Sequence, residues 1–84
     1  MIYPEIVSNQ LCERLQNVTG KYIPAKKLTL SEIAECEKEL ETIHGIAYRT
    51  FYDVNNSKYY YFMGRVNSAR RDLLEVICER SINL

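Results

Sequence analysis

The chain has 84 residues, and its eleven Lys and Arg residues balance eleven Asp and Glu residues. A chain of this length folds as one domain with one small core, which leaves no room for a deep pocket as well. The zero net charge argues against a domain that holds nucleic acid through a general positive field.

The first expected element is a helix over residues 4–19. Pro4 suits the first position of a helix. Apolar residues then recur every three or four positions, which places them on one side of the helix: Val7, Leu11, Leu15 and Val18. Gly20 is expected to end this helix, and Pro24 to keep the link after it out of the helical conformation.

The second helix is predicted over residues 30–44, and its start has the clearest local signature in the chain. Thr29 and Glu32 form a capping-box pattern, while Leu28 and Ile33 stand at the two positions of a hydrophobic staple. A narrow apolar stripe follows, made by Leu30, Ile33, Cys36, Leu40 and Ile43. Gly45 is expected to end the helix.

A β-hairpin is predicted over residues 46–63. Seven of the nine aromatic residues lie between Tyr48 and Phe62, on both sides of Asn55 and Asn56, and two asparagines can adopt the left-handed conformations of a two-residue turn. In this register Phe51, Tyr60 and Phe62 share one face, and Tyr48, Tyr52, Tyr59 and Tyr61 share the other. We expect the phenylalanine face to meet the helices and the four-tyrosine face to be exposed.

The last helix is predicted over residues 67–81, with Asn67 or Ser68 as its N-cap. Its apolar face comprises Val66, Ala69, Leu73, Val76 and Ile77. The element order is therefore α-α-β-β-α. The expected fold is a small single α+β domain over residues 1–84, in which three amphipathic helices pack on a two-stranded antiparallel hairpin.

Arginines gather near the predicted start of the last helix. Arg65 precedes it, and Arg70 and Arg71 fall in its first turns, where the helix dipole disfavours cations. Two interpretations are open. These guanidinium groups, with the backbone N–H groups of a helix start, could hold a phosphate or carboxylate group, or they could pair with the Glu-rich second helix. We favour internal pairing.

Residues that could carry chemistry are sparse. Cys12, Cys36, Cys78 and His44 lie on three separate predicted helices, without the close pairs that structural zinc sites use. We expect the cysteines to be reduced thiols that fill core positions. With one imidazole and no Gly-rich phosphate loop, we expect no metal, no cofactor and no enzymatic activity.

No stretch of the sequence approaches the roughly 18 apolar residues of a membrane span. The first residues, Met-Ile-Tyr-Pro-Glu, contain no basic leader. We therefore expect a cytoplasmic protein without a membrane partner.

The expected function is that of a non-enzymatic binding module, such as a small regulator, adaptor or inhibitor of the kind that phages and mobile elements also encode. Tyrosine and arginine concentrate binding energy at protein interfaces. The predicted partner-binding residues are Tyr48, Tyr52, Tyr59, Tyr61, Arg49, Arg65, Arg70 and Arg71. The predicted partner is a protein, or a second copy that joins the two hairpins into a four-stranded sheet.

Two alternatives remain at this point. The first is nucleic-acid binding, in which the tyrosines stack on single-stranded bases and the arginines contact phosphates. In the second, the rings fill a small core and the functional surface lies elsewhere.

Overall fold

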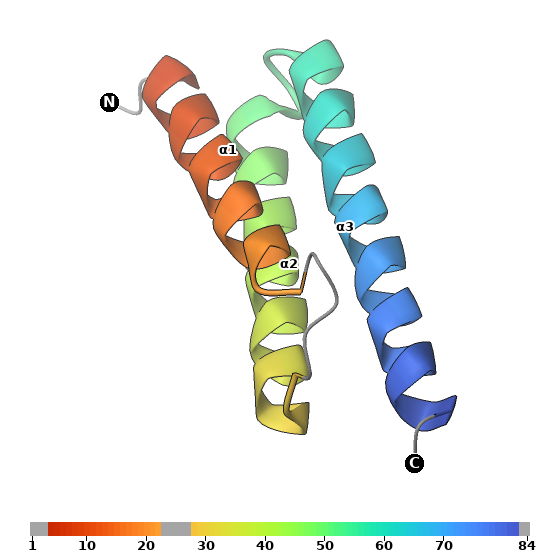
Figure 1. Cartoon of the computed structure of the whole chain (residues 1–84). Coiled ribbons are helices and arrows are strands. Elements are labelled where there is room, and N and C mark those ends of the chain that lie inside the picture. The colour runs from red at the N-terminus through yellow and green to blue at the C-terminus, as the bar shows by residue number, and fades with distance from the viewer. Residues whose placement is uncertain (1–3, 23–27, 83–84) are drawn as a thin grey trace.

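A computed structural model of the chain describes residues 4–22 and 28–82. It contains three helices, α1 (Pro4–Gly20), α2 (Leu30–Phe51) and α3 (Asn56–Ile82). In Figure 1, α2 runs in the opposite direction to both α1 and α3, and the short turn between α2 and α3 lies at the same end as the start of α1. The molecule is an elongated helical bundle measuring 48 × 18 × 17 Å.

One apolar stripe on each helix forms the core. The buried residues recur at alternating intervals of three and four along most of each stripe, which is the spacing that keeps side chains on one side of a packed helix. They are Leu11, Leu15 and Val18 on α1, Ile33, Cys36, Leu40, Ile43, Ala47 and Phe51 on α2, and Phe62, Val66, Ala69, Leu73 and Val76 on α3. Tyr22 and Leu28, outside the helices, complete this core.

The predicted β-hairpin over residues 46–63 is wrong, and with it the α+β fold class. Residues 46–51 continue α2, and residues 56–63 form the first two turns of α3. Ala47 and Phe51 extend the buried stripe of α2 by two steps of four residues, and Phe62 precedes Val66 by four. The described residues form no strand, so a dimer that joins β-ribbons is ruled out as well.

Burial of two phenylalanine rings accounts for the helical outcome. Phe51 and Phe62 are fully buried, and their rings stack with centroids 5.7 Å apart. Each such burial contributes about 1.5–3 kcal/mol. The intrinsic cost of an aromatic residue in a helix is below about 0.7 kcal/mol. Tertiary packing therefore outweighs the β preference of the aromatic segment.

Gly45, which was expected to end a helix, lies inside one instead, and so does Gly64, which directly follows the predicted hairpin. Gly45 is in the last third of α2, and Gly64 is in the third turn of α3. A glycine inside a helix costs about 1 kcal/mol relative to alanine, which the surrounding core offsets. The last helix accordingly begins at Asn56 and not at Asn67 or Ser68.

Side-chain caps set the starts of α2 and α3. The Thr29 hydroxyl accepts a hydrogen bond from the Glu32 N–H at 3.1 Å, and the Glu32 carboxylate accepts one from the Thr29 N–H at 3.0 Å. This is the capping box that the sequence indicates. At α3 the Asn55 side-chain oxygen accepts from the Lys58 N–H at 3.2 Å. Asn55 is therefore a helix N-cap and not part of a β-turn.

Polar contacts tie α1 to both other helices. The Arg14 guanidinium forms a two-pronged ion pair with the Glu39 carboxylate of α2, with N···O distances of 3.0 and 2.5 Å. This bond raises the pKa of Arg14 and lowers that of Glu39. On the other side, the Arg65 guanidinium of α3 lies 3.5 Å from the Cys12 sulfur. These contacts fix which sides of α2 and α3 are covered by α1.

Candidate partner-binding surface

Four tyrosines meet at the turn between α2 and α3. Tyr48 and Tyr52, four residues apart on α2, stack with ring centroids 4.7 Å apart. Tyr59, on the first turn of α3, packs edge-on against both, at 5.9 and 5.2 Å. Tyr60 packs edge-on against Tyr59 at 5.3 Å. These are the distances and tilts that aromatic pairs prefer, so the rings hold one another in place.

This cluster is exposed to solvent although it is apolar. The exposed fractions are 51% for Tyr48, 40% for Tyr52 and 64% for Tyr60, and Val54 in the turn itself is 75% exposed. We call the surface made by Tyr48, Tyr52, Val54, Tyr59 and Tyr60 the tip patch. Its rings sit at the same end of the bundle as the buried Phe51–Phe62 stack, so they belong to an ordered part of the molecule.

The structure brings together three of the four tyrosines that the sequence singled out, namely Tyr48, Tyr52 and Tyr59. Tyr61 is placed elsewhere: it lines a groove between α1 and α3, and its hydroxyl lies 3.4 Å from the Arg65 guanidinium. The sequence analysis missed Tyr60, which the predicted hairpin placed on the phenylalanine face, and did not include Val54 among the partner-binding residues. In a helix over residues 56–62, Tyr60 and Phe62 lie on different sides. In the predicted strand, alternation placed both of them on one face.

The four arginines of the predicted site do not converge. Arg49 is exposed near the end of α2 and Arg71 is exposed on α3, whereas Arg65 and Arg70 line two different grooves. Arg70 and Arg71 lie about four turns beyond the first residue of α3, so no helix start is near them. The alternative interpretation, in which these arginines and a helix N-terminus hold an anion, is therefore wrong. Within the part of the chain that the structure describes, the arginine seen in an ion pair with α2 is Arg14 of α1.

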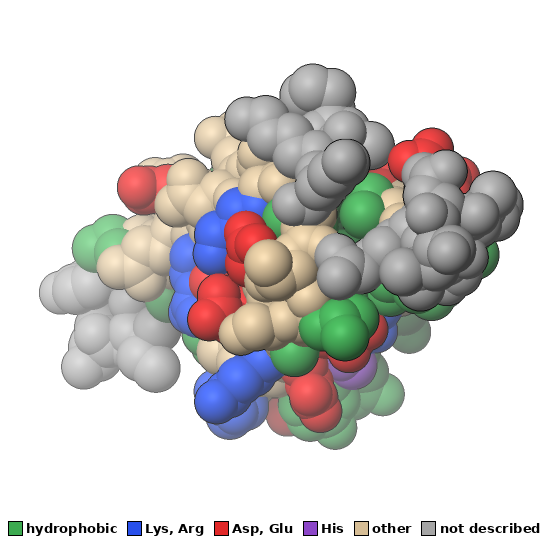
Figure 2. Space-filling model, turned by 60° about the horizontal axis from the view of Figure 1, so that its bottom comes forward, with side chains coloured by type: hydrophobic (Ala, Val, Ile, Leu, Met, Phe, Trp, Pro, Cys, Tyr) green, Lys and Arg blue, Asp and Glu red, His purple; other side chains and the backbone are tan. Residues whose placement is uncertain are grey.

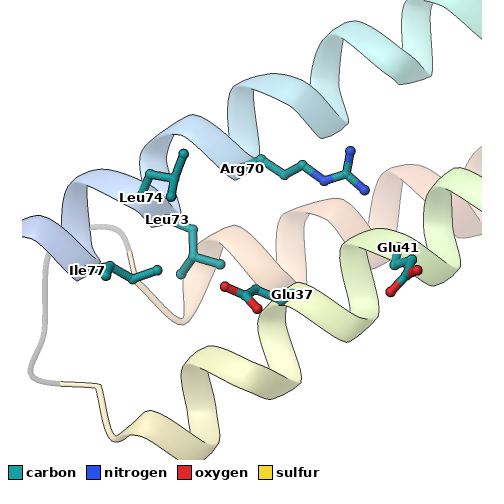
Figure 3. Close-up of a pocket in the computed structure, with 6 residues that line it drawn as sticks. All are labelled: Glu37, Glu41, Arg70, Leu73, Leu74 and Ile77. Carbon is teal, nitrogen blue, oxygen red and sulfur yellow. The ribbon is translucent and has the colours of Figure 1, made fainter.

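Two grooves run along α3. One, of about 290 Å³, lies between α2 and α3 (Figure 3) and is lined by Glu37, Glu41, Arg70, Leu73, Leu74 and Ile77. The other, of about 430 Å³, lies between α1 and α3 and is lined by Leu15, Thr19, Tyr61, Gly64, Arg65, Ser68, Ala69 and Asp72. Both are open and shallow, as grooves between packed helices are.

Groups that could carry chemistry stay apart in the described part of the chain. No three His, Cys, Asp or Glu side chains among residues 4–22 and 28–82 lie close enough together to hold a metal ion. The Cys36 thiol is buried in the core, and that burial raises its pKa. None of the described helices combines the length and the apolar character that crossing a membrane requires.

Charges of both signs are mixed on the surface. On the face shown in Figure 2, Lys and Arg side chains alternate with Asp and Glu side chains, and no large area of one sign is seen there. In the sequence, the tyrosines of the tip are flanked by Arg49, Asp53 and Lys58. The Lys58 ammonium lies 5.7 Å from the centre of the Phe51 ring.

The chain matches none of the protein-family models, curated proteins or solved structures with which it was compared. The surface itself must therefore carry any argument about function.

Proposed function

We propose that this chain is a non-enzymatic protein-binding module that contacts its partner through the tip patch. The observation that carries the proposal is a cluster of four tyrosines whose rings pack on one another at one end of the bundle. Tyr48, Tyr52 and Tyr60 are exposed, and so is Val54 in the adjoining turn. Exposed apolar side chains that lie singly need no explanation, whereas a contiguous cluster marks an interaction surface.

Tyrosine suits this role for physical reasons. Its ring buries a large area on binding, while its hydroxyl keeps a hydrogen-bonding group at the rim. The rings of Tyr48, Tyr52 and Tyr59 already touch one another, so little side-chain freedom remains to be lost on binding. A preordered aromatic surface binds more tightly than a mobile one of the same area.

The charges around the patch favour a protein over a nucleic acid as the partner. Arg49, Asp53 and Lys58 are next to tip-patch residues in the sequence, so charges of both signs occur there, and the chain as a whole is neutral. Arg70 and Arg71, which would have supplied phosphate contacts, lie several turns away from the tip along α3. We place this binding in the cytoplasm, in keeping with the free thiols of Cys12, Cys36 and Cys78.

Site-specific photocrosslinking tests the proposal. A photoreactive phenylalanine analogue replaces Tyr60 in the tip patch and, as a matched control, Tyr61, which is 54% exposed but lines the α1–α3 groove. In lysate of the native host, the Tyr60 position should yield a distinct protein adduct that the Tyr61 position does not. The same adduct should disappear when Tyr48→Ser and Tyr52→Ser are added, with the melting temperature little changed.

Two outcomes would count against the proposal. Equal adducts from both positions would mean that the tip patch has no special role. Recovery of nucleic acid from the Tyr60 position, with binding that weakens steeply as salt increases, would establish the nucleic-acid alternative in its place.

A further inference from the structure

One side of the α2–α3 pair is left uncovered by α1. The contacts of α1 reach α2 at Glu39 and α3 at Arg65, and Tyr22 reaches α3 at Ala69. The remaining side carries residues that follow one another every three or four positions on α2 and every three to seven on α3. These are Glu37, Glu41, His44, Tyr48 and Tyr52 on α2, and Tyr59, Met63, Arg70, Leu74 and Ile77 on α3. We call this surface the open face.

The open face has a charged centre between two apolar ends. In Figure 3, Arg70 extends from α3 across the groove toward the side of α2 that carries Glu37 and Glu41. Leu74, which is 59% exposed, and Ile77 lie at one end, and the tyrosines of the α2–α3 turn lie at the other. Acidic groups thus belong to one helix of the pair and the basic group to the other.

We propose that a second copy of the chain covers the open face, with the two-fold axis of the dimer parallel to the helices. Under this rotation α2 of one copy faces α3 of the other, so Glu37 and Glu41 lie opposite Arg70 of the partner subunit. Each apolar end of one copy meets the same end of the other copy. Leu74 therefore lies near Leu74 of the partner subunit, and the tyrosines of the two copies lie near each other. The α2–α3 pairs of the two copies then form a four-helix core with all neighbouring helices antiparallel.

The charge pattern selects this axis over the other two-fold arrangement. An axis perpendicular to the helices would set α2 against α2 and α3 against α3, so Glu37 and Glu41 would face their own counterparts and Arg70 would face the partner's Arg70. Like charges brought together at an interface cost several kcal/mol. The same pattern favours a second copy over an unrelated helix. After the two-fold rotation, the acids on α2 of one copy face the base on α3 of the other, so the surface is complementary to itself.

The length of the bundle favours a stable dimer. The molecule extends 48 × 18 × 17 Å, and the open face follows its long dimension from Ile77 to the tyrosines of the turn. The outline of the molecule on that side is of the same order as the roughly 800 Å² that each partner buries in a typical stable interface. Both turns lie at the same end in this dimer, so two tip patches stand side by side. Tyr48, Tyr52 and Tyr59 belong to both surfaces, whereas Tyr60 and Val54 lie outside the open face. A substitution at Tyr60 therefore tests partner binding without touching the proposed dimer interface.

A charge-exchange experiment tests the dimer by sedimentation velocity at tens of micromolar protein. One variant carries Glu37→Lys and Glu41→Lys, and the other carries Arg70→Glu. The wild type should sediment as a dimer, and each variant alone as a monomer with an unchanged helical circular dichroism spectrum. An equimolar mixture of the two variants should form a dimer again, because the introduced lysines then face the introduced glutamate and the two unchanged sites remain complementary.

An uncharged substitution keeps the proposal testable if a charge variant fails to fold. Leu74→Ser removes an exposed side chain and should weaken the dimer at least about tenfold, equivalent to about 1.4 kcal/mol. Ile6→Ser, at a residue 53% exposed on α1, is the matched control and should leave the dimer intact. Tyr60→Ser should also leave it intact, which separates this test from that of partner binding. A monomeric wild type, or a Leu74→Ser variant as dimeric as the control, would overturn the proposal.

Discussion

The Tyr22 hydroxyl donates a hydrogen bond to the Ala69 carbonyl oxygen at 2.7 Å, across 47 positions of sequence. This bond is buried, and the Tyr22 ring is 1% exposed. It joins the residue just after α1 to the middle of α3. The chain after α1 is thereby anchored on the far helix.

Removal of this hydroxyl should lower stability while the ring stays in place. Tyr22→Phe should reduce the free energy of unfolding by about 0.5–1.5 kcal/mol, the usual net value of one such hydrogen bond. Urea-induced unfolding followed by circular dichroism measures the change. Tyr60→Phe, which removes a hydroxyl from an exposed ring, is the matched control and should change stability by less than about 0.5 kcal/mol.

The same residue predicts how the protein responds to alkali. Burial, followed by the nearby charge of Asp72, raises the pKa of Tyr22 from 10.0 to about 12. Since the folded-state pKa lies above the unfolded value, the contribution of Tyr22 is complete below pH 10 and is lost as the pH rises to about 12. Wild-type stability should fall over this interval, and the fall should be shallower in Tyr22→Phe. Equal slopes would contradict the buried position of the phenol.

Gly64 offers a direct test of the continuous helix. Nothing lies within 4 Å of the position that a Cβ would occupy there, and the residue is exposed inside α3. Gly64→Ala should therefore stabilise the protein by about 0.5–1 kcal/mol and raise its melting temperature. If Gly64 ended a strand instead, alanine would give no such gain. An unchanged or lower melting temperature would count against the helix.

The N-cap of α3 can be tested with two adjacent asparagines. Asn55→Ala removes the side-chain oxygen that accepts from the Lys58 N–H, and should cost about 1 kcal/mol. Asn56→Ala changes the first residue of the helix proper and should be near neutral. Equal effects in chemical denaturation would mean that Asn55 does not cap the helix.

A double-mutant cycle on Arg14 and Glu39 should show a modest coupling. Both side chains are about one-third exposed, at 35% and 33%, so we expect about 0.2–1 kcal/mol near neutral pH. The hydrogen bond from Arg14 lowers the pKa of Glu39 below 4.5. The coupling should thus be complete above that pH and vanish as the pH falls through the folded-state pKa. A coupling that persisted in strong acid would require another explanation.

The sequence predicted the parts of the fold that local signals decide. The apolar spacing of α1 and the capping box of Thr29 and Glu32 act within one or two helical turns, and the structure contains both. The segment around Asn55 has no such unique local signal. Four aromatic residues in succession, Tyr59 to Phe62, satisfy a period of two as well as a period of 3.6. The choice between them depends on burial of Phe51 against Phe62, a tertiary contact.

Part of the tyrosine cluster does not depend on that choice. A chain that reverses direction near Asn55 brings Tyr52 close to Tyr59 whether the two arms are strands or helices, and the rings do meet at 5.2 Å. Which residue packs next to Tyr59 depends on whether the segment has the two-residue period of a strand or the 3.6-residue period of a helix. A strand places Tyr61 beside Tyr59, whereas the helix places Tyr60 beside Tyr59 and turns Tyr61 toward α1.

The stacked rings of Phe51 and Phe62 have a consequence for how the chain folds. They are only eleven residues apart in sequence, so the contact closes a short loop at little entropic cost. We expect α2 and α3 to form first as a helical hairpin around this stack, on the microsecond-to-millisecond timescale of proteins with local contacts. α1 would then dock in a later step, so substitutions at Phe51 should slow folding, whereas substitutions at Leu11 should mainly speed unfolding.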